Sequence, residues 1–236
     1  MRSARITLIV ALLAAPAALA AHASAAPAPT VPVVRCPTGF GVTGEARRTP
    51  TNVAVLGHPS STRGLIAYTN TWDFLVGPAG MACSGEVGAD GGSTLTVWPR
   101  GRPAPTVHAH EPGLTLFIEP ACVGCKAFEA CPFFSQFAVT EQMPCPSGIP
   151  PGERAYGLTP HATLFEDPPG VAGDGWPSGG SYPANGIVGD GSAASDPVYR
   201  ATCTLPASEH AICTVSLNDV FGRYGLLSPT GVTKPR

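Results

Sequence analysis

Short runs in which apolar and polar residues alternate recur along the chain. Residues 93–98 place Leu95 and Val97 on one side and mostly threonine on the other, which is the two-residue period of a half-buried strand. Turn residues separate this run from others of the same type, so the pattern predicts a mainly antiparallel sheet. The other predicted strands are residues 53–56, 65–69, 74–76, 114–118 and 198–205.

Two segments have the three-to-four-residue apolar spacing of a helix. In the first, Pro132 suits an opening turn and an apolar stripe follows over residues 134–141. In the second, Ser208 is the expected N-cap and Gly225 the residue that ends the helix. The sequence therefore predicts an α+β fold: a mainly antiparallel β-sheet with about two short helices, braced by disulfides and carrying long Gly/Pro-rich loops.

Gly, Pro, Asp and Ser dominate residues 165–195. A segment of this length inside a domain is usually a functional loop, and loops on a rigid scaffold often carry binding residues. Aromatic side chains are enriched at interfaces. The expected contact residues are Glu166, Asp167, Asp174, Trp176, Tyr182 and Asn185.

The N-terminus has the three parts of a secretory signal. Arg2 and Arg5 supply positive charge, residues 6–20 form an uncharged and mostly apolar core, and small residues follow. This predicts a signal peptide over residues 1–23, cleaved between 20 and 26, and a secreted or extracytoplasmic protein. The apolar core is shorter than the roughly 20 residues a spanning helix needs, so no membrane span is expected in the mature form.

The rest of the chain reads as one folded unit. Residues 24–32 are rich in Pro and Ala and are predicted to form an extended tether. A single domain is expected over residues 33–225, followed by a C-terminal tail at 226–236. The formal net charge is −2 and the few basic residues are scattered, which argues against nucleic acid as a partner.

Eight cysteines are present, and an even number in an exported chain predicts disulfides. Cys203 and Cys213 are spaced so that a strand–turn–helix corner can bring them within bridging distance. We therefore predict this bridge. The other six cysteines remain in unassigned pairs: Cys36, Cys83, Cys122, Cys125, Cys131 and Cys145.

Cys122 and Cys125 form a C-x-x-C pair, which is the redox motif of thioredoxin-like proteins. Together with Cys131 and Cys145 they could instead hold zinc through thiolates. The βαβ pattern of a thioredoxin is missing, and oxidation after export competes with metal for every thiol. Structural bridges are therefore favoured, and no metal or cofactor is predicted.

Other candidate chemistry is weaker. His108, His110 and Glu111 could bind a metal if the segment is extended, but prolines surround them. The carboxylates of the 165–195 loop could bind calcium, although the EF-hand spacing is absent. The hydrolase signatures G-x-S-x-G, S-x-x-K and H-E-x-x-H are also absent. A paired-carboxylate site stays open, because such groups meet only in the folded chain.

Several longer motifs resemble a family of uncharacterised secreted bacterial proteins, a domain of unknown function with several paired cysteines. The resemblance covers about residues 33–225 and implies export, a shared fold and an ordered element at residues 165–186, but no activity. The motifs lie at residues 36–37, 77–83, 121–125, 130–132, 165–170, 173–175, 177–180, 182–186, 203–206 and 210–213.

These features together predict a secreted or envelope-associated, non-enzymatic binding or structural module whose extracellular or cell-envelope ligand is unknown. The alternative is a secreted hydrolase with an Asp/Glu–His site near residues 165–190. A disulfide-exchange protein acting through Cys122 and Cys125 is a third hypothesis. The residues alone leave open whether the protein is an enzyme.

Overall fold

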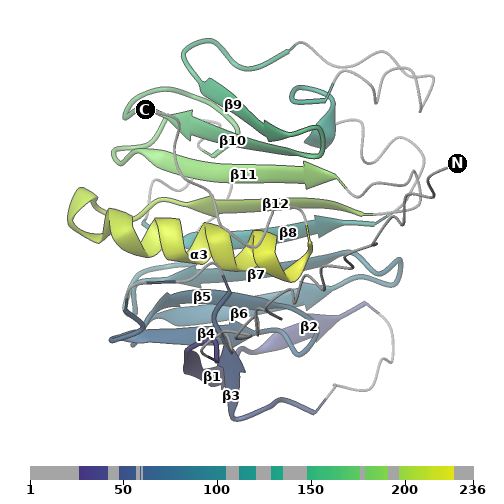
Figure 1. Cartoon of the computed structure of the whole chain (residues 1–236), viewed down its shortest axis with the longest axis vertical. Coiled ribbons are helices and arrows are strands. Elements are labelled where there is room, and N and C mark those ends of the chain that lie inside the picture. The colour runs from purple at the N-terminus through teal and green to yellow at the C-terminus, as the bar shows by residue number, and fades with distance from the viewer. Residues whose placement is uncertain are drawn as a thin grey trace, which may run out of the picture.

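Twelve strands and one long helix make up the described part of the computed structural model. That part comprises residues 27–41, 48–56, 59, 61–104, 112–120, 129–134, 148–175, 179–190 and 197–225. The strands form one sheet of eight and one of four (Figure 1). This confirms the predicted α+β fold with a mainly antiparallel sheet.

The larger sheet has the strand order β2-β6-β7-β8-β12-β11-β10-β9. Every neighbouring pair is antiparallel except β2 and β6. Its strands are β2 (Thr38–Phe40), β6 (Ala82–Val87), β7 (Ser93–Trp98), β8 (Leu114–Glu119), β9 (Arg154–Thr159), β10 (Ala162–Asp167), β11 (Ala184–Asp190) and β12 (Val198–Cys203).

The smaller sheet has the order β3-β1-β4-β5. Its strands are β1 (Thr30–Arg35), β3 (Asn52–Ala54), β4 (Leu65–Thr69) and β5 (Phe74–Pro78). Strand β1 pairs with β3 through its first half and with β4 through its second half. Pro32 lies in the first half, which does not pair with β4. The absence of an N–H on proline therefore leaves no β4 carbonyl without a donor. Residues 30–32, predicted as the end of the tether, thus belong to the folded unit, and Val31 is buried.

All six predicted strands are present, but six others were not predicted: β1, β2, β6, β9, β10 and β11. Strand β10 is buried on both faces, so it lacks the alternation that identifies a half-buried strand. Glycines interrupt β6, β9 and β11. The expected loop over residues 165–195 is therefore wrong in part, because residues 165–167 belong to β10 and residues 184–190 form β11.

Helix α3 (His210–Arg223) follows a short 3-10 turn, η1 (Ala207–Glu209). The predicted N-cap is wrong: Ser208 lies inside η1, and Glu209 occupies the cap position without a side-chain hydrogen bond. The predicted end is confirmed. Gly225 has a φ of 68°, the left-handed conformation in which glycine commonly ends helices.

The other predicted helix is not supported where the structure describes it. Pro132 follows helical residues 129–130 rather than opening a helix. The amides of Phe133 and Phe134 both donate to the carbonyl of Ala130, so the residues around Pro132 form a turn. The rest of the predicted helix, residues 135–141, lies outside the described residues.

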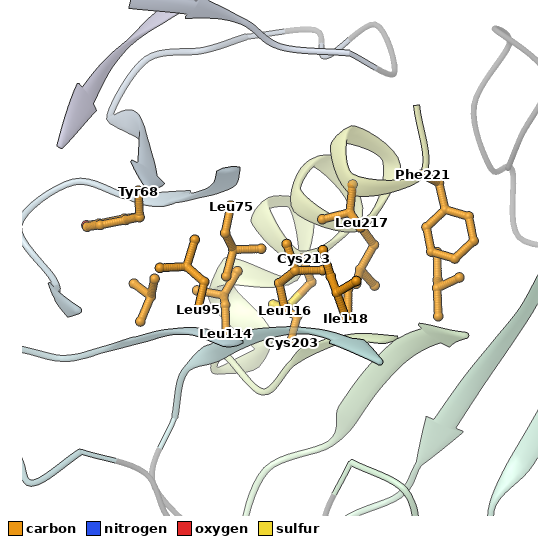
Figure 2. Close-up of a cluster of buried hydrophobic side chains, with 14 of the residues drawn as sticks. Tyr68, Leu75, Leu95, Leu114, Leu116, Ile118, Cys203, Cys213, Leu217 and Phe221 are labelled. Atoms are coloured by element: carbon orange, nitrogen blue, oxygen red, sulfur yellow. A yellow bond between two sulfur atoms is a disulfide. The ribbon is translucent and has the colours of Figure 1, made fainter. Parts of the chain in front are cut away.

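The main core lies between one face of the larger sheet and a layer formed by the smaller sheet and α3. Leu95 of β7 and Leu116 of β8 are completely buried on this face. Figure 2 shows Leu75 of the smaller sheet and Leu217 and Phe221 of α3 packed over it. Burial of these apolar side chains is the main stabilising term of the fold.

A second, smaller core covers the opposite face near β10 and β11. Phe165 is fully buried there and its ring stacks on that of Phe133, with ring centroids 5.8 Å apart. Gly186 of β11 faces Phe165, and a Cβ at this position would lie 2.0 Å from the ring. Only glycine fits beside this phenylalanine without a rearrangement.

Two disulfides connect described residues. Cys203 and Cys213 join the end of β12 to the first turn of α3, with Cα atoms 5.4 Å apart, which confirms the bridge predicted from spacing. Cys36 and Cys83 join the residue after β1 to β6, also with Cα atoms 5.4 Å apart. Cys131 is also disulfide-bonded, whereas Cys122, Cys125 and Cys145 lie outside the described residues.

We expect the two bridges to differ in their contribution to stability. Removing Cys36–Cys83, whose cysteines are 47 residues apart, relaxes a longer loop of the unfolded chain than removing Cys203–Cys213, which are 10 apart. Loop-closure entropy then predicts a loss of free energy of unfolding about 1 kcal/mol larger for the Cys36→Ala/Cys83→Ala variant. Guanidinium unfolding of the two double variants measures this, and the reverse order would contradict it.

Candidate functional site

The predicted contact residues lie on two faces of the larger sheet. Glu166 and Asn185 are cross-strand partners on β10 and β11 and lie on the side of the main core. The adjacent Asp167 lies on the opposite side. Asn185 is 8% exposed and Asp167 is completely buried, so neither offers a free surface. The six residues therefore do not form one contact patch.

Tyr182 and Asp174 lie in the connection between β10 and β11, and both are partly exposed. Trp176 falls outside the described residues. Tyr156 of β9 donates a hydrogen bond to Glu166, with an O–O distance of 3.4 Å. Asp174, by contrast, lies next to Gly175, whose amide donates to Asp167, and both carboxyl groups act on the pKa of Glu153.

A carboxyl pair, Glu153 and Asp167, lies at the point where β9 and β10 meet this connection. Arg154 and Glu166 are the last aligned residues of the two strands, so Glu153 and Asp167 stand next to each other one position further along. Glu153 is 9% exposed and Asp167 is 0% exposed. Two acidic groups thus share an enclosed site.

The carboxyl pair binds the backbone of the 168–175 segment, the described first half of the connection. The amide of Asp174 donates to Glu153 Oε2 at 2.7 Å, and the amide of Gly175 donates to Asp167 Oδ2 at 2.8 Å. A Cβ at Gly173 would lie 2.0 Å from Asp167 Oδ1, so this glycine lets the backbone approach the carboxylate closely.

Arg200 of β12 holds the same segment from the other side. Its Nη2 donates to the Asp174 carbonyl at 2.8 Å and to Asp174 Oδ1 at 2.5 Å, and its Nη1 forms an ion pair with Glu129. The guanidinium also lies over the ring of Phe165, 5.8 Å from its centroid. The Arg200 guanidinium thus forms ion pairs with Asp174 and Glu129, neither of which belongs to the carboxyl pair.

Burial raises the pKa of Glu153 to about 9, and the neighbouring Asp167 and Asp174 add to this increase. The amide of Asp174 acts in the opposite direction, because a hydrogen bond to the carboxylate favours its ionised form. A side-chain hydrogen bond between Glu153 and Asp167 also raises the pKa of Glu153. At neutral pH, Glu153 is therefore protonated.

A surface groove of about 390 Å³ lies elsewhere, at one end of both sheets. The strand ends that meet there belong to β5, β6, β7, β8 and β12. Tyr68 fixes part of its wall, donating to the Pro78 carbonyl at 2.5 Å and accepting from the Met81 amide at 3.1 Å. The groove is lined by Pro78, Ala79, Gly80, Met81, Pro99, Arg100, Pro112, Leu205, Pro206 and Glu209.

The lining of this groove combines rigid apolar groups with two opposite charges. Arg100 is exposed and Glu209 is partly exposed, and neither forms an ion pair with another described residue. Leu205 and Pro206 directly follow β12, which the Cys203–Cys213 bridge fixes to α3. The groove can therefore hold a ligand without a large rearrangement of its walls.

Nothing in the sequence pattern indicated Glu153 as a partner of Asp167, because neither β9 nor β10 was predicted. Arg200 could have been singled out, since it is a charged residue within a predicted strand. The residues that line the groove come from five separate segments, so only the fold brings them together.

The other sites considered from the sequence either lie outside the described residues or are not found among them. Cys122, Cys125, His108, His110 and Glu111 lie outside the described residues. Among those described, no three His, Cys, Asp or Glu side chains are arranged to hold a metal ion. No helix in the described part of the chain is long and apolar enough to cross a membrane.

Comparisons with known proteins find no relative. No family model matches the chain, and neither a curated protein nor a solved structure is similar enough to match it.

Replacing Arg200 should destabilise the fold because Glu129 and Asp174 would lose their cation in a mostly enclosed site. The Arg200 side chain is 17% exposed, so we expect Arg200→Met to lower the free energy of unfolding by about 2 kcal/mol. Arg154→Met, at an exposed position of β9, is the matched control and should change stability little. Urea unfolding compares the two, and equal losses would show that Arg200 has no special role.

Proposed function

We propose that this chain is a secreted or envelope-associated, non-enzymatic binding module whose ligand occupies the groove between Arg100 and Glu209. One observation carries the proposal. Asp167 and Asp174 are the carboxylates that the sequence suggested for catalysis. Asp174 binds Arg200, and Asp167 accepts a backbone amide of its own connection, so neither faces an open cleft. Their geometry supports a structural role.

The groove supports binding in a second way. Its walls are turns and strand ends that prolines and a disulfide restrain, so little conformational entropy is lost when a ligand binds. Arg100 and Glu209 provide opposite charges for orienting the ligand. The resemblance to a family of secreted bacterial proteins, which implies export without a known activity, belongs to the same proposal.

A secreted hydrolase remains the second candidate, since the fold does bring three carboxyl groups together. The pKa of Glu153 is raised to about 9, so it is protonated at neutral pH, as a general acid must be. Against this candidate, Asp167 is completely buried and its Oδ2 accepts the Gly175 amide. A substrate would have to displace the 168–175 segment to reach it.

Binding to cell-wall sacculi tests the two candidates together. We expect the protein to co-sediment with purified sacculi without releasing soluble fragments. Ala79→Trp places a large side chain at an exposed position of the groove and should reduce the bound fraction about tenfold or more. Val34→Trp, on an exposed site of β1, is the matched control and should bind normally.

Equal binding by the Ala79→Trp and Val34→Trp variants would contradict the groove as the binding site, and absence of co-sedimentation would contradict a cell-wall ligand. Release of soluble fragments that Asp167→Asn abolishes would favour the hydrolase instead.

Export can be tested directly. We expect protein recovered from the culture medium to begin between Ala21 and Ala26, because the signal peptide is predicted to be cleaved between residues 20 and 26. Such cleavage leaves β1 intact, since that strand begins at Thr30. N-terminal sequencing measures the site. Recovery of the chain only from the cytosol, with Met1 retained and free thiols, would contradict export.

A further inference from the structure

We propose that the carboxyl pair of Glu153 and Asp167 holds the 168–175 segment against the larger sheet only while the pair keeps one proton, so that the segment detaches as the pH rises. The proposal concerns a conformational device and does not depend on the function of the groove.

The contacts of the segment provide the first argument. Among the described residues, the hydrogen bonds that join residues 168–175 to groups outside the connection are the Asp174 amide on Glu153, the Gly175 amide on Asp167 and the bonds from Arg200 to Asp174. Two of these three attachments end on the carboxyl pair. A change in the charge of the pair therefore acts directly on the groups that position the segment.

The enclosure of the pair provides the second argument. Both side chains are more than nine-tenths buried and stand at adjacent cross-strand positions. Two carboxylates so close together cannot both be ionised at low cost, because their repulsion is poorly screened away from water. One shared proton removes this repulsion and adds a hydrogen bond between the two groups.

The surrounding charges do not substitute for the proton. Arg200 is the nearby cation, and it is bound to Asp174 and Glu129. Asp174 itself adds negative charge next to the pair. Arg154 and Glu166, the neighbouring residues of β9 and β10, lie on the other face of the sheet. Glu129 and Asp174 thus already bind this guanidinium, so the pair has a bound proton, rather than a cation, to offset its negative charge.

The direction of the effect follows from linkage. With the segment in place the pKa of Glu153 is about 9, whereas an exposed glutamate has a pKa near 4.5. Between these values the closed form binds one proton that the detached form lacks, so closure is most favourable at acidic pH and weakens as the pH rises. The detachment equilibrium should increase about tenfold per pH unit over this window.

Amide hydrogen exchange of Asp174 and Gly175 in the full exported chain tests the proposal. After correction for intrinsic exchange, we expect the opening constant of both amides to rise about tenfold per pH unit between about pH 6 and pH 9. Glu153→Gln keeps an acceptor for the Asp174 amide but cannot ionise, so its opening constant should be independent of pH. Glu166→Gln, one residue from Asp167 on the other face, should behave like wild type.

An equal pH slope in wild type and Glu153→Gln, or no slope in wild type, would overturn the proposal. If Glu153→Gln does not fold, the wild-type chain still gives a decisive reading by infrared spectroscopy. A protonated carboxylic acid band should be present at neutral pH and disappear by about pH 10, because the buried proton is then lost. Absence of this band at neutral pH would also overturn the proposal.

Discussion

The structure depends on the burial of one face of the eight-stranded sheet beneath the smaller sheet and α3. Leu95 and Leu116 point to this face from neighbouring strands, and Leu75, Leu217 and Phe221 cover them (Figure 2). Because strand residues alternate between faces, fixing this apolar face also fixes which residues point the other way. Phe165, Asp167 and Arg200 are among these, so the packing of the core sets the position of the charged cluster.

The charged cluster shows how acidic residues can serve a structural purpose. The backbone amides of Asp174 and Gly175 need acceptors where the connection folds onto the sheet, and Glu153 and Asp167 supply them. Enclosing these acceptors brings two carboxyl groups together and makes a proton part of the folded state. A carboxyl cluster that resembles an acid–base site can thus arise from the hydrogen-bonding needs of a glycine-rich segment.

The groove arises from a different feature, the common end of several strands. The turns at the ends of β5, β7 and β12 converge there, and prolines occupy many of these turns. The Cys203–Cys213 bridge lies just before Leu205, so the same cross-link that connects α3 to the sheet also fixes one wall of the groove. Stability and surface shape are therefore coupled at this end of the molecule.

The sequence by itself determined the fold class, the strands with clear alternation, the end of α3 at Gly225 and the Cys203–Cys213 bridge. These features depend on neighbouring residues: a two-residue period, a glycine that adopts a positive φ, and two cysteines separated by one corner. Only the tertiary structure decided that Cys36 pairs with Cys83, that residues 162–167 and 184–190 are strands, and that Glu153 meets Asp167. Each of these joins segments through strand register and packing, which no local pattern of residue types encodes.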